Sequence, residues 1–146
     1  MDSKKSLRQT GTTNGPAGHK IGNIATILVA DDSYSCLIVA EAYLKRETNA
    51  KILFANNGRE ALELLKTETV DLILLNITMP EVGGLVVARE AEAMGIPVIF
   101  LTASSKQQHG KELEEIKYIY YLMKPITRQE FQVALAKAGV VKNVNA

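Results

Sequence analysis

The chain has 146 residues, of which 47% are hydrophobic and 23% are charged, and its formal net charge is +1. This length suits one compact domain with a single core and is too short for two ordinary domains. The near-zero charge creates no field that would attract nucleic acid or an anionic membrane, and no apolar stretch approaches the roughly 20 residues needed to cross a bilayer. We therefore expect no direct binding to nucleic acid and no insertion into a membrane.

The single cysteine, Cys36, excludes an internal disulfide and fits a reducing compartment, so a cytoplasmic location is expected. Its apolar neighbours favour a small buried side chain. Residues 1–23 are rich in Ser, Thr and Gly with almost nothing apolar to bury, which predicts a flexible tail or linker. One folded domain is expected over residues 24–140, followed by a C-terminal tail at 141–146. A stand-alone protein and a piece of a longer chain both remain open.

From Ile24 onward, short apolar runs alternate with amphipathic stretches of helical length. This alternation is typical of repeated βα units built around a parallel sheet. Strands are predicted near residues 26–31, 51–55, 71–75, 97–101 and 118–122. The sequence therefore predicts an α/β fold in which five strands alternate with five helices.

Capping residues and apolar periodicity locate the helices. Ser33 is suited to cap the first, Asn57 with Glu60 resembles a capping box for the second, and Thr127 with Glu130 forms one for the last. The positions expected to face the core are Leu37, Ala40 and Leu44, then Ala61, Leu64 and Leu65, and finally Phe131, Ala134, Leu135 and Ala138 before a stop at Gly139. Two more helices are predicted over 85–94 and 106–116, the second with a start weakened by Gln107, Gln108, His109 and Gly110.

Polar side chains follow four of the predicted strands. Asp31 and Asp32 follow the first, Asn76 the third, Thr102 the fourth and Lys124 the fifth. The carboxyl ends of parallel strands meet at one edge of a sheet, where open α/β sheets place their ligand crevice. An acidic pair suits Mg²⁺, and an ammonium or hydroxyl group suits phosphoryl oxygens. Taken singly each group has a structural explanation, such as helix capping for the acidic pair.

Together these segments resemble the receiver domain of bacterial-type two-component response regulators, similar in plan to the single-domain chemotaxis receiver. The residues that carry the resemblance are Ile27-Leu28-Val29-Ala30-Asp31-Asp32, Asp71-Leu72-Ile73-Leu74-Leu75-Asn76, Met79-Pro80 with Gly84, Leu101-Thr102-Ala103, and Tyr121-Leu122-Met123-Lys124-Pro125. The resemblance covers residues 24–140. It implies a doubly wound, flavodoxin-like sheet in the order 2-1-3-4-5 and phosphoryl transfer from a histidine kinase or phosphotransfer protein to one aspartate.

The resemblance also implies a role for each matching residue. Asp31 and Asp32 match the metal-binding acidic pair, Thr78 the position whose backbone carbonyl completes the metal shell, Thr102 the switch hydroxyl, Lys124 the pocket lysine and Tyr121 the aromatic that follows the switch. A downstream protein is expected to bind the face formed by the fourth helix, the fifth strand and the last helix. Ile116-Lys117 in place of a small Gly-Ala pair, and the extra Tyr118 and Tyr120, depart from the family pattern on that face. Each tyrosine is expected either to anchor a partner or to pack internally.

Asn76 falls on the phosphoacceptor position, and it is also a member of the implied metal shell. A carboxylate attacks phosphorus through oxygens that carry a full negative charge, whereas an amide oxygen carries only a partial one. We therefore expect no phosphorylation as the chain stands, weakened Mg²⁺ binding, and a domain that folds without metal in one inactive-like conformation. A natural asparagine and an engineered block are both compatible with the sequence.

Two other function classes compete with a phosphoryl-accepting receiver. A pseudo-receiver acting as a protein docking module needs no phosphorylation. A metal-dependent phosphohydrolase commonly places a second acid two residues after its nucleophile, whereas Asp31 is followed by Asp32 and Ser33. We therefore expect a signalling domain rather than an enzyme. His19 and His109 lie far apart in polar stretches, which disfavours a zinc site and predicts solvated side chains.

Overall fold

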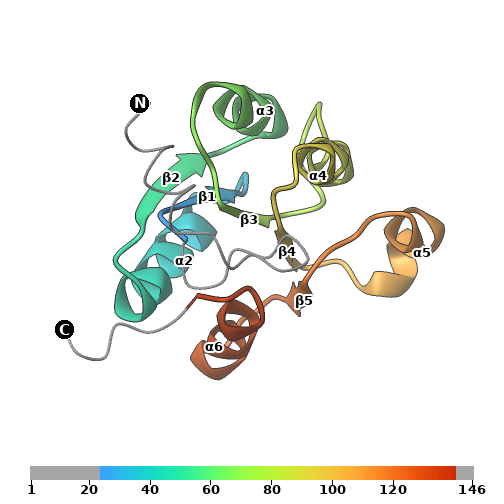
Figure 1. Ribbon diagram of the computed structural model, residues 1–146. Coiled ribbons are helices and arrows are strands. Elements are labelled where there is room, and N and C mark those ends of the chain that lie inside the picture. Colours follow the sequence, from blue (N-terminus) through green and yellow to red (C-terminus); the bar gives the residue numbers. More distant parts are fainter. Residues whose placement is uncertain (1–23, 141–146) are drawn as a thin grey trace.

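The computed structural model describes residues 24–140, in which five parallel strands form one sheet in the order β2-β1-β3-β4-β5. The strands are β1 (Thr26–Ala30), β2 (Lys51–Ala55), β3 (Leu72–Leu75), β4 (Val98–Thr102) and β5 (Tyr120–Met123). The helices are α2 (Tyr34–Glu47), α3 (Gly58–Thr67), α4 (Gly84–Ala93), α5 (Lys106–Glu114) and α6 (Arg128–Lys137) (Figure 1). The predicted doubly wound fold and its strand order are confirmed, whereas the expectations for residues 1–23 and 141–146 lie outside the described residues.

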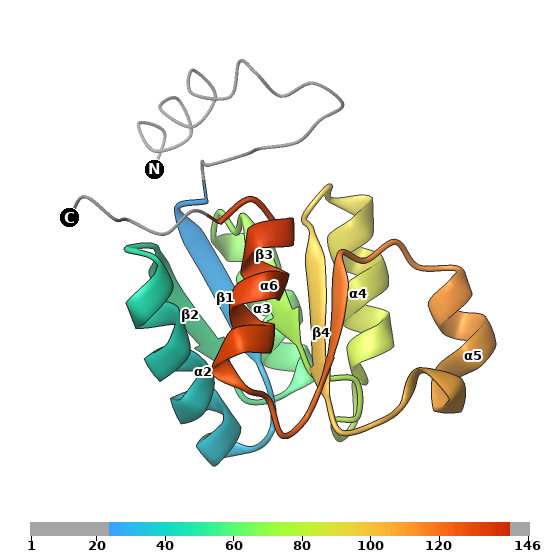
Figure 2. The same ribbon diagram turned by 90° about the horizontal axis from the view of Figure 1, so that it is seen from below.

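Helices cover both faces of the sheet and divide the core into two apolar clusters. Helices α2 and α6 lie on one face, while α3 and α4 lie on the other with α5 beyond them (Figures 1 and 2). Alternate residues of β1 enter different clusters: Ile27 and Val29 pack with α2 and α6, and Leu28 and Ala30 pack with α3 and α4. Because both faces are covered, β1, β3 and β4 are buried along their whole length, as expected for central parallel strands.

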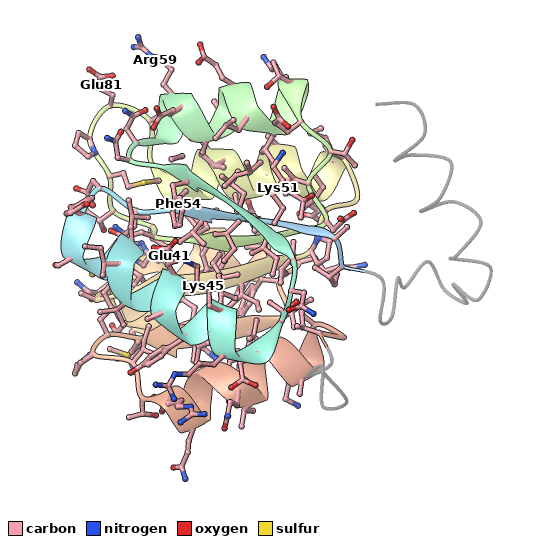
Figure 3. All side chains as sticks on the ribbon, turned by 90° about the vertical axis from the view of Figure 1, so that its left-hand side faces the viewer. Glu41, Lys45, Lys51, Phe54, Arg59 and Glu81 are labelled. Atoms are coloured by element: carbon pink, nitrogen blue, oxygen red, sulfur yellow. The ribbon has the colours of Figure 1, made fainter. Side chains whose placement is uncertain are left out.

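The edge strand β2 is more exposed and runs between α2 and α3, as Figure 3 shows. Two surface ion pairs lie on this side of the molecule, Glu41 with Lys45 on α2 and Arg59 with Glu81. Glu81 has a φ of 64°, in the left-handed region that is uncommon for a residue other than glycine. None of the helices within residues 24–140 combines the length and apolarity that crossing a bilayer requires.

The predicted capping residues begin their helices. The Ser33 hydroxyl accepts from the Cys36 N–H at 3.4 Å, Asn57 Oδ1 from the Glu60 N–H at 2.7 Å, and Thr127 Oγ1 from the Glu130 N–H at 3.1 Å. In a capping box at the second helix, the Glu60 carboxylate would accept from the N–H of the cap residue, Asn57. It accepts instead from the N–H of the preceding residue, Asn56, at 2.8 Å.

Helix α5 corrects one expectation drawn from the sequence. Gln108 belongs to the polar stretch that weakened the predicted start, yet its Oε1 accepts from the Ser105 N–H at 2.7 Å and so caps the helix. His109 is half-buried rather than solvated, and its Nε2 is enclosed without a hydrogen-bond partner. Cys36 is likewise only half-buried instead of fully buried, because it lies beside a cavity between α2 and α6.

The fifth strand begins two residues later than predicted. Residue 118 lies outside the strand because the Tyr118 ring packs edge-on against Phe100 on one side of the sheet, with centroids 5.3 Å apart. Backbone pairing then starts at Ile119, whose N–H donates to the Val98 carbonyl at 2.7 Å. Tyr120 packs with the opposite cluster. Both added tyrosines therefore have packing roles.

The loop after β3 is held against the start of α4 by a close approach. A Cβ atom at Gly84 would collide with the backbone carbonyl of Asn76, so only glycine fits without displacing the main chain. The Gly84 N–H also donates to the Ile77 carbonyl at 2.7 Å. This contact fixes the backbone at the strand end that carries Asn76.

Candidate functional site

The polar residues predicted to converge follow neighbouring strands and lie at one edge of the sheet. Asp31 follows β1, Asn76 follows β3, Thr102 ends β4 and Lys124 follows β5. The backbone continues the sheet through these positions, since the Asp31 N–H donates to Ala55 O at 3.0 Å, Asn76 N–H to Ala30 O at 2.9 Å and Lys124 N–H to Thr102 O at 2.8 Å. The side chains therefore start from a rigid frame.

An ion pair between half-buried Lys124 and buried Asp31 lies at the centre of the site. Lys124 Nζ donates to Asp31 Oδ2 at 2.7 Å, and the exposed fractions of the two side chains are 19% and 1%. Burial alone would lower the pKa of the Lys124 ammonium, but the hydrogen bond and charge of Asp31 raise it above its ordinary value. The other oxygen of Asp31 accepts from the Ser33 N–H at 2.9 Å. Lys124 is therefore charged at neutral pH and bridges the ends of β5 and β1.

The Asn76 amide nitrogen points at the remaining oxygens of the site. Nδ2 lies 2.9 Å from the Thr78 carbonyl oxygen, 3.2 Å from Asp32 Oδ1 and 3.4 Å from Asp31 Oδ1. These three partners are acceptors when both carboxylates are ionised, so they select the orientation in which the NH₂ group, rather than the amide oxygen, faces them. The Asn76 side chain is buried, and its contact with Asp31 offsets part of the desolvation of that buried carboxylate, whereas Asp32 is exposed.

Thr78 connects this group to a second set of hydroxyls. Its backbone carbonyl accepts from Asn76, and its own hydroxyl lies 3.2 Å from Ser104 Oγ. Thr102 Oγ1 is fully buried, lies 3.5 Å from the same Ser104 hydroxyl, and accepts from the Ser104 N–H at 3.3 Å. Ser104 thus joins the residues at the ends of β3 and β4.

Tyr121 is tied to the same serine. Its hydroxyl donates to the Ser104 carbonyl at 2.7 Å, and its ring packs against both Phe100 and Tyr118. Lys106 Nζ lies 5.6 Å from the ring centroid. Burial, followed by the neighbouring Tyr118, raises the pKa of Tyr121. The side chain is therefore contacted by the Ser104 carbonyl, two aromatic rings and the Lys106 ammonium.

Sequence reasoning missed Ser104, whose side chain and backbone contact Thr78, Thr102 and Tyr121. A hydroxyl residue two positions after a strand-end threonine was the available signal, because such residues often bond back to the preceding turn. The predicted residues otherwise fall into two connected groups: Asp31, Asp32, Asn76, Thr78 and Lys124 in one, and Thr102 with Tyr121 in the other.

Comparison with known proteins agrees with the fold. Residues 27–136 match the family described as the response regulator receiver domain. This match spans most of the chain, and the chain therefore belongs to that family. A receiver domain is a signalling module of two-component systems, and it interacts with histidine kinases or phosphotransfer proteins.

Curated relatives include the transcriptional regulatory protein ZraR of Escherichia coli, 34% identical over 77% of this chain and 26% of the relative. The sensor histidine kinase GacS of Pseudomonas protegens is 31% identical over 78% of this chain and 13% of the relative. The chain thus spans about a quarter or less of these proteins. Among solved structures, a signal receiver domain of an HD domain-containing protein from Pseudomonas fluorescens is 27% identical, with a TM-score of 0.71 over 79% of this chain and 94% of that one. A CheY-like receiver from Methanospirillum hungatei also has a TM-score of 0.71, over 78% and 92% of the two chains at 21% identity, which shows the fold alone.

Receiver domains generally bind Mg²⁺ at their acidic pocket. The oxygen and nitrogen atoms at the corresponding site of this chain therefore show whether it suits a Mg²⁺ ion. Asp31, Asp32 and the Thr78 carbonyl supply oxygens, but the Asn76 NH₂ group is directed at all three. Within residues 24–140, no cluster of three or more His, Cys, Asp or Glu side chains is arranged to hold a metal. An N–H donor repels a cation, so this arrangement does not fit Mg²⁺ unless the amide turns over and gives up its hydrogen bonds.

Proposed function

We propose that this chain is a receiver in which Asn76 stands at the phosphoacceptor position and prevents phosphorylation. The supporting observation is the contact of Asn76 Nδ2 with the Thr78 carbonyl, Asp32 and Asp31. The amide hydrogens make favourable contacts with the oxygens that would otherwise require a cation. The oxygens of the site are thereby hydrogen-bonded by a side chain of the domain itself.

The chemistry of the group leads to the same conclusion. Attack on phosphorus needs an anionic oxygen that is oriented by a cation and by Lys124. In this chain the amide directs hydrogens toward the acidic pair, and Lys124 is paired with Asp31. Neither the nucleophile nor the charge balance required for phosphoryl transfer is present. In this proposal Thr102 and Tyr121 keep the roles of switch hydroxyl and switch aromatic, but both remain tied to Ser104.

Mass spectrometry of intact protein tests this proposal. The chain and the Asn76→Asp variant are incubated with acetyl phosphate and Mg²⁺. We expect a one-phosphoryl adduct on Asn76→Asp and none on the parent chain. The Asn76→Asp, Lys124→Met double variant is the control, because it has the nucleophile without the ammonium. A phosphoryl adduct on the parent chain, or none on Asn76→Asp, would contradict the proposal.

A docking module that works without phosphorylation is the second candidate, and the hydrogen bond between the Tyr121 hydroxyl and the Ser104 carbonyl favours it. This bond holds Tyr121 on the face formed by α5, β5 and α6 while Asn76 occupies the phosphoacceptor position. Met123 and Val133 are about half-exposed on β5 and α6. If docking alone is the function, a partner protein captured with the parent chain is expected to bind two proteins with equal affinity. These are the parent chain and the Asn76→Asp variant after treatment with acetyl phosphate. A change in affinity on phosphorylation would instead indicate a switch that Asn76 blocks.

A further inference from the structure

A cavity of about 560 Å³ lies between α2 and α6, next to the candidate site and on the side of the sheet that faces the viewer in Figure 2. Its volume is within the range of about 300–1,000 Å³ that is typical of small-molecule sites. The lining residues come from α2, the end of β4, the segment after β5 and α6. They are Ser35, Cys36, Val39, Ala40, Tyr43, Leu101, Lys124, Pro125, Ile126 and Phe131.

The lining is apolar except at one end. Tyr43 is a polar residue of the wall, but its hydroxyl already donates to the Ile126 carbonyl at 3.3 Å and its ring packs on Phe131 at 5.3 Å. The polar end is formed by Lys124 with the nearby Cys36 and Ser35. An apolar chamber with a few polar groups gathered at one end is suited to an amphipathic ligand.

The charged side chain in the lining is that of Lys124, whose ammonium is shared with Asp31. The Lys124 ammonium has three N–H donors, and Asp31 is the carboxylate paired with it in the part of the chain that the structure describes. At the end of β3, position 76 carries a neutral amide, whereas an aspartate there would be a second anion competing for the Lys124 ammonium. Asp31 takes one of the three donors, and the Cys36 side chain is a second hydrogen-bond partner of the ammonium. One donor is therefore left for a ligand, and a carboxylate is the group that an ammonium binds most strongly through charge-assisted hydrogen bonds.

We propose that this cavity binds a small amphipathic carboxylate, with its apolar body between α2 and α6 and its carboxylate at the Lys124 ammonium. Such a ligand shares the lysine with Asp31 and therefore alters the ion pair that links the ends of β1 and β5. Binding in the cavity is thereby coupled to the strand-end site. The proposal does not depend on whether Asn76 prevents phosphorylation, because Lys124 and the cavity are present in either case.

Octanoate is the probe for this site, compared with octanol and octylamine, all below micelle-forming concentrations. The full 146-residue chain is titrated with each and followed by amide chemical shifts. Octanoate is expected to shift residues around Cys36, Val39, Lys124 and Ile126. Octanol is expected to bind about tenfold more weakly, since it loses a charge-assisted hydrogen bond, and octylamine more weakly still. Equal affinity for the three probes, or shifts confined to other surfaces, would overturn the proposal.

Cys36 provides an independent readout because it is the single cysteine of the chain. Its labelling by a small maleimide, followed by intact mass, reports access to the polar end of the cavity. Octanoate is expected to slow labelling in proportion to its occupancy measured by chemical shifts. Unchanged labelling at saturating octanoate would place the ligand elsewhere and overturn the proposal.

Two neighbouring residues of α2 form a matched pair of variants. Val39 and Ile38 are 46% and 47% exposed, but only Val39 is among the residues that line the cavity. Val39→Trp is expected to fill the entrance and weaken octanoate binding at least tenfold, while Ile38→Trp leaves it unchanged. Thermal melting confirms that each variant is folded. If the two variants bind octanoate with equal affinity, the cavity is not the binding site. If Val39→Trp abolishes binding of a partner protein but not of octanoate, the cavity is part of a docking surface and the proposal fails.

Discussion

Two carboxylates at opposite ends of the same sheet are equally buried and serve different purposes. At the amino end, Asp71 is 2% exposed and its Oδ2 accepts from the backbone N–H groups of Ala25 and Thr26 at 3.0 and 2.9 Å. At the carboxyl end, Asp31 is 1% exposed; the Ser33 N–H is a backbone donor to it, and its other partners are the side chains of Lys124 and Asn76. Backbone partners move only if the sheet moves, whereas side-chain partners can rearrange one at a time. Asp71 therefore stabilises the fold, whereas Asp31 belongs to a site whose side chains can rearrange.

The largest effect is expected at the amino end. Asp71→Ala leaves the buried N–H of Thr26 and the partly buried N–H of Ala25 without this acceptor. We expect the free energy of unfolding to fall by about 3 kcal/mol, measured by urea denaturation. Asp71→Asn is the matched control, because its amide oxygen keeps one neutral acceptor, and it is expected to lose less. A loss below about 1 kcal/mol in Asp71→Ala would show that this end is not the more rigid one.

The next effect is expected from Lys124→Met, which removes the cation and leaves Asp31 buried. Because Lys124 is partly exposed, we expect a loss of about 2 kcal/mol rather than the full cost of breaking a deeply buried pair. Lys124→Arg keeps the charge as a control. A double-mutant cycle with Asp31→Asn measures the coupling directly, and additive losses would show that the pair is not stabilising.

Asn76→Asp tests the opposite change at the same end. A third carboxylate beside Asp31 and Asp32 adds repulsion, which Lys124 offsets in part, so in EDTA we expect a loss of about 1.5 kcal/mol. Mg²⁺ is expected to restore this stability by binding the folded state, whereas the parent chain is expected to respond little. Equal responses of the two proteins to Mg²⁺ in urea denaturation would contradict the role assigned to the Asn76 amide.

A smaller, pH-dependent effect follows from the raised pKa values of Lys124 and Tyr121. A group whose pKa is higher in the folded state stabilises it fully below the unfolded pKa, about 10.4 for Lys and 10 for Tyr, and loses that contribution as the pH rises through the folded value. Stability is therefore expected to fall above pH ~10. Urea denaturation across this range is expected to show a shallower fall for Lys124→Met; identical slopes would count against the Lys124 contribution.

The smallest effect is expected for the exposed pair of Arg59 and Glu81, whose side chains are both 68% exposed (Figure 3). Glu81→Gln is expected to change the free energy of unfolding by less than about 0.5 kcal/mol, because solvent and salt screen the pair. The same 3.2 Å contact in a buried setting would matter far more. A loss comparable to that of Lys124→Met would show that burial does not explain the difference between these pairs.

Much of the architecture was predictable because its signals are local. Ser33, Asn57 and Thr127 cap helices through groups only a few residues away, and the fully apolar run of β3 can be read directly as a buried strand. The start of β5 was predicted less well, since Tyr118 lies outside the strand and packs on Phe100 from β4. That packing depends on a partner the local pattern does not contain.

The amino-acid sequence by itself determined which residues follow the strands and that position 76 carries an amide, because strand ends are set by short apolar runs. The tertiary structure decided what those residues do to one another. Lys124 meets Asp31 across 93 positions of the chain. Ser104 contacts residues of β4, β5 and the loop after β3, and the Asn76 amide is oriented by the acceptors around it. The physical reason is that hydrogen bonds and charge pairs act over a few ångströms in space, and only the packed sheet brings such distant residues within that range.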